Sequence, residues 1–113
     1  MHELALSQSI IDLVVEAARR EGLRRVSGVL VEIGAAAGVE AEALRFCFGV
    51  AAEETIAEGA TLTIAPVALR ARCRGCAGEF APSSLFAACP HCAGHDRELL
   101  AGRELRVKSF EAE

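Results

Sequence analysis

The sequence predicts an α+β fold in which two helices accompany a small sheet and a cysteine-rich segment interrupts the strands late in the chain. Two stretches carry apolar residues at helical spacing, and three others have strand patterns. Four of the five cysteines fall in two close pairs between the last two predicted strands. At 113 residues the chain has the length of one small domain, so we expect one compact core with a small inserted unit.

The first third of the chain predicts a helix followed by a strand. Apolar residues recur every three or four positions from Leu6, and Gly22 follows two arginines as a C-terminal stop. The stretch VSGVLVEIG at residues 26–34 is rich in β-branched residues and places Val29, Val31 and Ile33 on one face. It is therefore predicted to be a strand.

A second helix is predicted from about Glu40 to Glu54, after a loop of small residues. We expect Cys47 to be a buried core thiol, because it lies on the apolar face of this helix. The predicted face consists of Val39, Ala43, Phe46, Cys47 and Val50, widened by Leu44, Phe48 and Ala51.

Two further strands are predicted on either side of the cysteine pairs. Residues 61–72 are expected to form a strand in two pieces, because Pro66 cannot donate a hydrogen bond to a neighbouring strand. Residues 99–110 alternate apolar Leu105 and Val107 with charged neighbours, as a half-buried strand does. No internal repeat or low-complexity tract is expected.

Charge and hydropathy narrow the function classes. The formal net charge of −4 argues against a surface that neutralises nucleic-acid phosphates or anionic lipid. No apolar run approaches the roughly 20 residues of a membrane helix, and the opening MHELALSQS has an acidic residue where a signal peptide carries basic ones. We therefore expect a cytoplasmic protein, and cysteines in that reducing compartment are more typical of metal sites than of disulfides.

Cys73, Cys76, Cys89 and Cys92 are predicted to hold Zn(II). They form two CxxC pairs separated by twelve residues, which is close to the spacing of structural zinc sites. Four thiolates favour zinc over hard cations and leave no open position for a substrate, so the site is expected to be structural. A redox dithiol and an iron–sulfur site are the alternatives. The redox reading is weaker, because neither CxxC opens a helix within a βαβ pattern.

Charged neighbours of the cysteine pairs have two readings each. Arg70, Arg72 and Arg74 either offset thiolate charge or are solvated charges at a strand end. His91 and His95 either replace a thiolate and make the site sensitive to pH, or are exposed side chains outside the ligand set.

The opening residues predict a second metal site. The Met1 amine, the His2 imidazole and deprotonated backbone amides can close small chelate rings in one plane, and this nitrogen set suits Ni(II) or Cu(II) better than zinc. Glu3 adds a carboxylate or orients the imidazole.

The chain as a whole resembles the HypA/HybF family of hydrogenase nickel-incorporation proteins. The opening MHELALSQSI, the stretch VLVEIGAAAGVEAEALRFCF, the paired CxxC motifs and the tail GRELRVKSFEAE carry the resemblance over nearly all 113 residues. It implies two helices packed on a small three-stranded antiparallel sheet, with the zinc knuckle inserted between the last two strands. The corresponding domains are residues 1–72 with 98–113, which bind nickel, and residues 73–97, which bind zinc.

The resemblance also implies a function as a nickel metallochaperone rather than an enzyme. It implies that Ni(II) is bound through Met1, His2 and Glu3, with Glu40 as a weaker candidate because ordinary helix N-terminal charge also explains it. The implied partners are a HypB-type GTPase, the [NiFe] hydrogenase large subunit and, in some organisms, urease maturation proteins, with the chain acting as a monomer or homodimer.

Two alternative functions are compatible with the cysteine pairs. A zinc-ribbon module for nucleic acid or a protein complex uses the same pairs, but the chain offers no basic stripe interleaved with aromatics. A thiol redox enzyme requires an accessible cysteine of low pKa. Hydrolase or transferase chemistry has no motif here.

Overall fold

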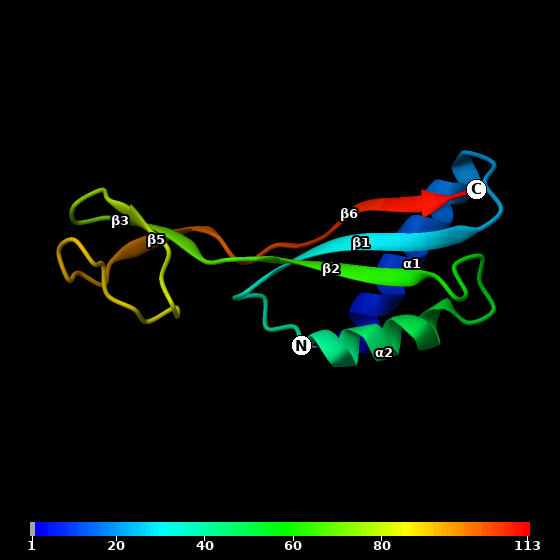
Figure 1. Cartoon of the computed structure of the whole chain (residues 1–113), viewed down its shortest axis with the longest axis horizontal. Coiled ribbons are helices and arrows are strands. Elements are labelled where there is room, and N and C mark those ends of the chain that lie inside the picture. The colour runs from blue at the N-terminus through cyan, green and yellow to red at the C-terminus, as the bar shows by residue number, and fades with distance from the viewer. Residues whose placement is uncertain (1) are drawn as a thin grey trace. The chain divides into compact units, whose positions relative to one another are not determined.

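The computed structural model describes residues 2–113 and confirms an α+β architecture (Figure 1). Two helices and two three-stranded sheets make up the fold. In chain order the elements are α1 (Glu3–Arg20), β1 (Val26–Gly34), α2 (Ala41–Ala52), β2 (Thr61–Val67), β3 (Arg70–Cys73), β4 (Glu79–Phe80), β5 (Arg97–Ala101) and β6 (Leu105–Ala112).

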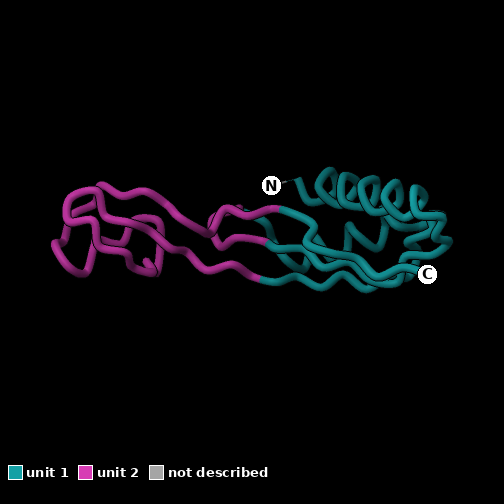
Figure 2. The backbone as a smooth tube through the Cα atoms, turned by 90° about the horizontal axis from the view of Figure 1, so that it is seen from above, with its two compact units in different colours: residues 1–32, 38–65, 106–113 teal, residues 33–37, 66–105 magenta. Residues whose placement is uncertain are grey.

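The chain divides into two compact units, drawn in different colours in Figure 2. The first comprises Met1–Glu32, Gly38–Ala65 and Arg106–Glu113, and the second comprises Ile33–Ala37 and Pro66–Leu105. The second unit includes β3 and β5 as well as the cysteine pairs, so its bounds are wider than residues 73–97. The assignment of one metal to each domain stays a prediction.

The first unit packs both helices on one face of the sheet β2-β1-β6 (Figure 1). Val29 and Val31, two of the predicted inner residues of β1, are buried there, and Ile33 at the start of the second unit is buried as well. The hydroxyl of the buried Ser7 donates to the carbonyl oxygen of Leu44 at 3.4 Å and links the two helices. Apolar burial against the sheet therefore supplies most of the stabilisation of this unit.

Strand direction in this sheet differs from the expected all-antiparallel arrangement. The ends of β1 and β6 exchange hydrogen bonds between Arg25 and Glu113, so these two strands are antiparallel. A side chain at Gly28 would approach Thr61, and the amide of Ala35 donates to Val67, so β1 and β2 run in the same direction. The segment that contains α2 makes a crossover connection, which parallel neighbours require.

The buried face of α2 is rotated from the predicted face. Leu44, Phe48 and Ala52 are buried at intervals of four residues, whereas Phe46 is 74% exposed. Cys47 is only half-buried, so the expectation of a core thiol was wrong. With apolar residues almost all round this helix, composition could not fix which stripe faces α1.

The second unit contains the short antiparallel sheet β4-β3-β5. The predicted strand over 99–110 is broken into β5 and β6 at Gly102, where φ is +120°. A side chain at this glycine would meet the Leu69 side chain at 2.6 Å. Ala71, Cys73, Phe80 and Cys89 form the small core of this unit, with Leu99 packed against it.

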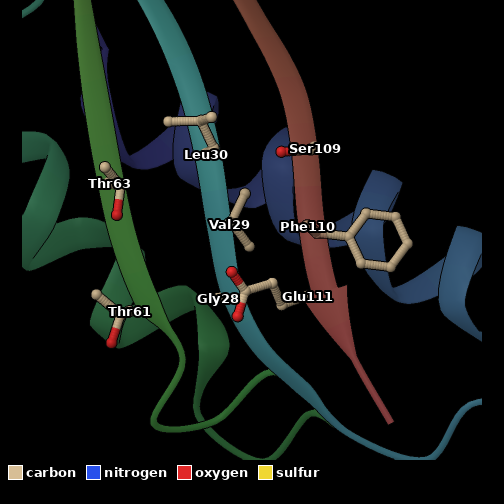
Figure 3. A pocket seen from close by; sticks show the side chains of 8 residues that line it. All are labelled: Gly28, Val29, Leu30, Thr61, Thr63, Ser109, Phe110 and Glu111. Atoms are coloured by element: carbon tan, nitrogen blue, oxygen red, sulfur yellow. The ribbon is translucent and has the colours of Figure 1, made fainter.

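The sheet face opposite the helices of the first unit is open, and Figure 3 views it with the helices behind the strands. A shallow hollow of about 420 Å³ lies over its strands. Its lining includes Thr61, Thr63 and Ser109, and its one ionisable side chain is that of Glu111. A single carboxylate beside neutral side chains is too small a ligand set for a metal site. Separately, among residues 2–113 no helix has the length and apolar character needed to cross a bilayer.

Candidate metal centre

The two cysteine pairs are built from the same six-residue pattern. Residues 73–78 read CRGCAG and residues 89–94 read CPHCAG. In each, the first cysteine donates its amide to the glycine carbonyl, and the alanine donates its amide to the first cysteine's carbonyl, at 2.8–2.9 Å. The C-x-x-C-A-G repeat was not predicted from the sequence, because four shared positions in each six-residue turn are too few to stand out. The repeat places two identical turns around one point.

The alanine of each turn has a left-handed backbone. φ is +63° at Ala77 and +61° at Ala93, a conformation that costs a non-glycine residue about 1–2 kcal/mol. The hydrogen bonds that close each turn hold the alanine in this conformation.

The four sulfur atoms come together as a metal site requires. All four lie within 4.8 Å of one another. Across the pairs, the Sγ–Sγ distances are 3.5 Å for Cys73–Cys92 and 3.7 Å for Cys76–Cys89. A tetrahedron with Zn–S bonds of about 2.3 Å has sulfur–sulfur edges of about 3.8 Å. The donor set therefore fits Zn(II).

The thiols of the cluster differ in burial and in acidity. Cys73 and Cys89 are buried, whereas Cys76 and Cys92 are exposed. Backbone N–H groups of Cys76 and Gly75 donate to the Cys73 sulfur and lower its pKa to about 7. At Cys92 the Gly94 N–H lowers the thiol pKa, but the hydrogen bond to Cys73 and the partial desolvation of the sulfur outweigh it and raise the pKa to about 12. Because thiolates are the metal-binding form of cysteine, a bound cation would favour ionisation of the ligand thiols.

The arginines near the first pair are held by carboxylates. Arg70 and Arg72 both bond Glu79, at 3.2 and 3.6 Å, and Arg74 bonds Asp96 at 3.2 Å. These pairs are about half exposed and contribute little to stability. These three arginines are therefore better described as paired, solvated charges than as groups that directly offset the charge of the thiolates.

The histidines border the sulfur cluster without joining it. The His91 amide donates to the Cys89 sulfur at 3.4 Å, and its ring lies against Gly78, where a Cβ would be 2.8 Å from His91 Cδ2. His95 is exposed beyond the second turn. The cluster that could hold an ion consists of four cysteines, so the reading of both histidines as side chains outside the ligand set is favoured.

Two of the predicted N-terminal ligands, His2 and Glu3, lie at the start of α1. Met1 lies outside the described residues; His2 is exposed at the N-cap and its side chain makes no capping hydrogen bond. The Glu3 carboxylate accepts the Glu40 amide at 3.1 Å, and this bond is the main cause of a Glu3 pKa below its ordinary value. The Glu40 side chain accepts the amides of Glu42 and Ala43, so it caps α2. Glu3 is thus an ionised, oriented carboxylate next to His2.

An α+β fold with paired C-x-x-C turns defines a small metal-binding protein rather than a catalytic domain. The family model described as "Hydrogenase/urease nickel incorporation, metallochaperone, hypA" matches residues 1–112, and the chain belongs to this HypA family.

Full-length relatives support this assignment. The hydrogenase maturation factor HypA of Chlorobaculum tepidum is 43% identical, and HybF of Klebsiella pneumoniae is 42% identical, each over 100% of both chains. The solution structure of a HypA protein is 26% identical with a TM-score of 0.76, covering 100% of this chain and 97% of the other. The Ni metallochaperone HypA from Helicobacter pylori shares the fold, with a TM-score of 0.69 at 24% identity and coverage of 99% and 97%.

Family membership settles the broad function. The chain is a hydrogenase maturation factor with a role in nickel incorporation, and it is not an enzyme. It therefore acts together with the hydrogenase maturation machinery. The zinc-ribbon and redox-enzyme alternatives have no support from these relatives.

Proposed function

We propose that the chain binds Ni(II) at its N-terminus and delivers it during maturation of [NiFe] hydrogenase. The observation that carries this proposal is an unchanged MHE start, at the head of α1, in a chain whose family is described by nickel incorporation. Urease is a second possible recipient, since the family description includes it.

The proposed nickel ligands are the Met1 amine, the His2 imidazole, intervening backbone nitrogens and the Glu3 carboxylate. Support comes from the exposure of His2 and from the orientation of Glu3 by the Glu40 amide. A planar nitrogen set suits Ni(II), and an exposed site lets a recipient's ligands approach the ion. Delivery is then ligand exchange, in which the donor atoms on nickel are replaced one at a time.

We propose Zn(II) as the ion held by Cys73, Cys76, Cys89 and Cys92. Their sulfur–sulfur distances and their soft thiolates support zinc. Four protein ligands leave no position for a substrate, so the zinc is structural. Two of these ligands, Cys73 and Cys89, also belong to the core of the second unit, so the ion supports the fold there directly.

The proposed partners are a HypB-type GTPase as nickel donor or co-chaperone and the hydrogenase large subunit as recipient. A chain that gains and loses a metal by ligand exchange needs a protein on each side of the transfer. The hydrogenase maturation factors named among its relatives support this pair of partners.

A nickel titration tests the N-terminal site. Zinc-loaded, untagged protein with a native Met1 amine is compared with His2→Ala, with Glu3→Gln, and with a version extended by one residue before Met1. Ligand-field absorption and circular dichroism in the visible range report planar nickel. The planar signal is expected to be lost in the His2 variant and the extended protein, with zinc content unchanged.

Glu3→Gln separates a ligand role from an orienting role. A carboxylate ligand predicts weaker nickel binding with an altered spectrum, whereas an orienting carboxylate predicts weaker binding with the same spectrum. Equal nickel binding in wild type, His2→Ala and the extended protein would place nickel elsewhere and refute the proposed site.

A further inference from the structure

The second unit carries two adjoining hollows that belong to neither metal site. One, of about 410 Å³, is lined by Arg74, Leu85, Arg97, Glu98, Leu99 and Arg103. The other, of about 250 Å³, is lined by Leu99, Leu100, Ala101, Arg103 and Glu104. Because Leu99 and Arg103 line both, the two hollows adjoin beside β5. This surface is called the β5 groove below.

Arg103 is the residue of this groove that lacks an internal partner. Of the unit's other arginines, Arg74 is bound to Asp96 and Arg97 donates to the Ala87 carbonyl. Arg70 and Arg72 are paired with carboxylates, as described above. Arg103 makes no hydrogen bond or ion pair with any residue between 2 and 113 in the structure. Arg103 therefore lines both hollows with its guanidinium donors available to a ligand.

Exposed apolar side chains lie in or next to the lining of the groove. Leu85 is 42% exposed on the groove wall, and its neighbour Phe86 is 86% exposed. The Arg97 side chain, by bonding the Ala87 carbonyl, ties the loop that carries both residues to β5. An exposed leucine and phenylalanine on a fixed loop are typical of a contact surface rather than of a solvated turn.

We propose that the β5 groove binds an extended segment of a partner protein that has one carboxylate beside a bulky apolar side chain. The guanidinium fork of Arg103 matches a carboxylate, and Leu85 and Leu99 offer an apolar contact beside it. Two joined hollows suit an extended chain better than a single small anion. The proposal does not depend on where nickel binds.

The acidic residues of the groove argue for an isolated carboxylate and against a nucleic acid. Glu98 and Glu104 lie in the hollows on either side of Arg103 and repel a chain of phosphates. The whole protein also has a formal net charge of −4. A peptide that places one carboxylate at Arg103 and apolar atoms against the leucines avoids both repulsions.

Fluorescence anisotropy with a defined probe tests the proposal. The probe is a fluorescein-labelled, capped peptide with the sequence Gly-Leu-Asp-Leu-Gly, and the control peptide has Asn in place of Asp. Zinc-loaded full-length protein is titrated at low and high salt. The Asp peptide is expected to bind at least about tenfold more tightly than the Asn peptide, with the difference reduced at high salt.

Arg103→Glu and Arg24→Glu form a matched pair of protein variants. Both arginines are exposed and both changes alter the net charge equally, but Arg24 lies in the first unit. Arg103→Glu is expected to abolish the preference for the Asp peptide, Arg103→Gln to weaken it, and Arg24→Glu to leave it unchanged. Amide chemical shifts of Leu85 and Leu99 are expected to move on binding.

Three outcomes would overturn the proposal. They are equal affinity for the two peptides, equal loss in Arg103→Glu and Arg24→Glu, and tighter binding of a short RNA that displaces the Asp peptide. His2→Ala protein is expected to bind the peptide normally, so failure of the nickel proposal and failure of this one give different results.

Discussion

At the scale of single residues, Gly34 and Gly49 differ in whether the surrounding structure leaves room for a side chain. A Cβ at Gly34 would lie 2.1 Å from the carbonyl carbon of Gly102 and 2.5 Å from the Arg103 amide nitrogen. Nothing lies within 4 Å of a Cβ at Gly49, which is exposed in the middle of α2. The first glycine permits close approach of two backbones, whereas the second only weakens a helix.

These glycines give a paired prediction. Gly34→Ala is expected to lower the free energy of unfolding by at least about 2 kcal/mol, because backbone cannot move aside as a flexible side chain can. Gly49→Ala is expected to raise it by about 1 kcal/mol through helix propensity. Urea unfolding followed by far-UV circular dichroism measures both, and a tolerated Gly34→Ala would show that the two backbones lie farther apart.

The Glu32 and Arg106 pair predicts a pH dependence. Their side chains bond at 2.7 Å, and this bond lowers the Glu32 pKa below the ordinary value of 4.5. A lowered pKa in the folded state stabilises the protein above the ordinary value, and the contribution is lost as pH falls through the lowered pKa. Glu32→Gln is therefore expected to be less stable than wild type at pH 7, and the difference is expected to shrink as the pH falls toward 2.5.

Unfolding curves at several pH values check this difference, with Glu16→Gln as a control. Glu16 pairs with Arg20 on a highly exposed helix surface, so its replacement is expected to have a smaller effect. A Glu32→Gln difference that persists undiminished at pH 2.5 would mean that the bond with Arg106 is not its source.

At this scale the sequence predicted a site correctly where metal binding requires a particular residue type at a particular spacing. The spacing of four cysteines predicted one cluster, and their sulfurs do meet. The same reasoning misjudged Cys47, because a single apolar thiol carries no spacing information. It also missed the left-handed Ala77 and Ala93, since alanine gives no signal for a positive φ that only the closed turn imposes.

At the scale of elements, α2 depends on an unusual cap. Glu40 accepts the amides of Glu42 and Ala43 at 3.3 and 2.6 Å, while its own amide donates to Glu3. One residue thereby satisfies two helix N–H groups and connects the start of α2 to the start of α1. A glutamate reaches these amides with a side chain one carbon longer than that of the usual aspartate cap.

Removal of this cap is expected to destabilise α2. Glu40→Ala should lower the free energy of unfolding by about 1 kcal/mol, the usual contribution of an N-cap. Glu42→Ala is the control, because Glu42 makes only an exposed 3.5 Å pair with Arg45. Hydrogen exchange at residues 42–45 should rise in the first variant alone, and equal rates in the two variants would contradict the capping role.

Elements were predicted well from periodicity and poorly from composition. The regular spacing predicted a helix where α1 lies, and the alternation past Pro66 correctly predicted that Leu69 and Ala71 are buried. In α1, however, Leu13 is exposed and the buried Ile11 was not predicted. For α2 the sequence gave a helix with the wrong face, since Phe46 and Phe48 are equally apolar and only packing against α1 distinguishes them. The parallel pairing of β1 and β2 depends on the crossover through α2, which no local pattern encodes.

At the scale of the whole molecule, the two units depend on metal to different degrees. The core of the first unit is made of aliphatic and aromatic side chains from α1, α2 and β1. The core of the second consists of Ala71, Cys73, Phe80 and Cys89, so half of its residues are proposed zinc ligands. A core this small is marginal without an ion.

Removal of zinc is therefore expected to unfold the second unit and to leave the first unit folded. In full-length protein treated with a chelator under reducing conditions, amide protection should be lost over residues 70–101 and retained in α1 and α2. Two-dimensional NMR with hydrogen exchange measures this, and zinc addition should restore the spectrum. Uniform loss of protection, or none, would contradict this division of stability.

Cys89→Ser and Cys47→Ser separate metal binding from general thiol effects. Cys89 is a proposed ligand in the core of the second unit, whereas Cys47 is a half-buried thiol on α2. Only Cys89→Ser is expected to reproduce the effect of the chelator at equal zinc concentration.

The pairing of β6 with β1 sets an order of assembly. Residues 105–112 pair with residues 26–34, and the entire cysteine-bearing segment lies between them in the chain. During synthesis the ribosome releases both C-x-x-C turns before the strand that completes the first sheet. Until β6 emerges, β1 has an open edge beside α1, a state that exposes apolar surface and invites pairing with other chains. Zinc shortage would therefore have two effects on folding. The second unit would stay unfolded, and β6 would have to pair with β1 across a disordered segment of about 40 residues, which raises the entropic cost of closing that loop.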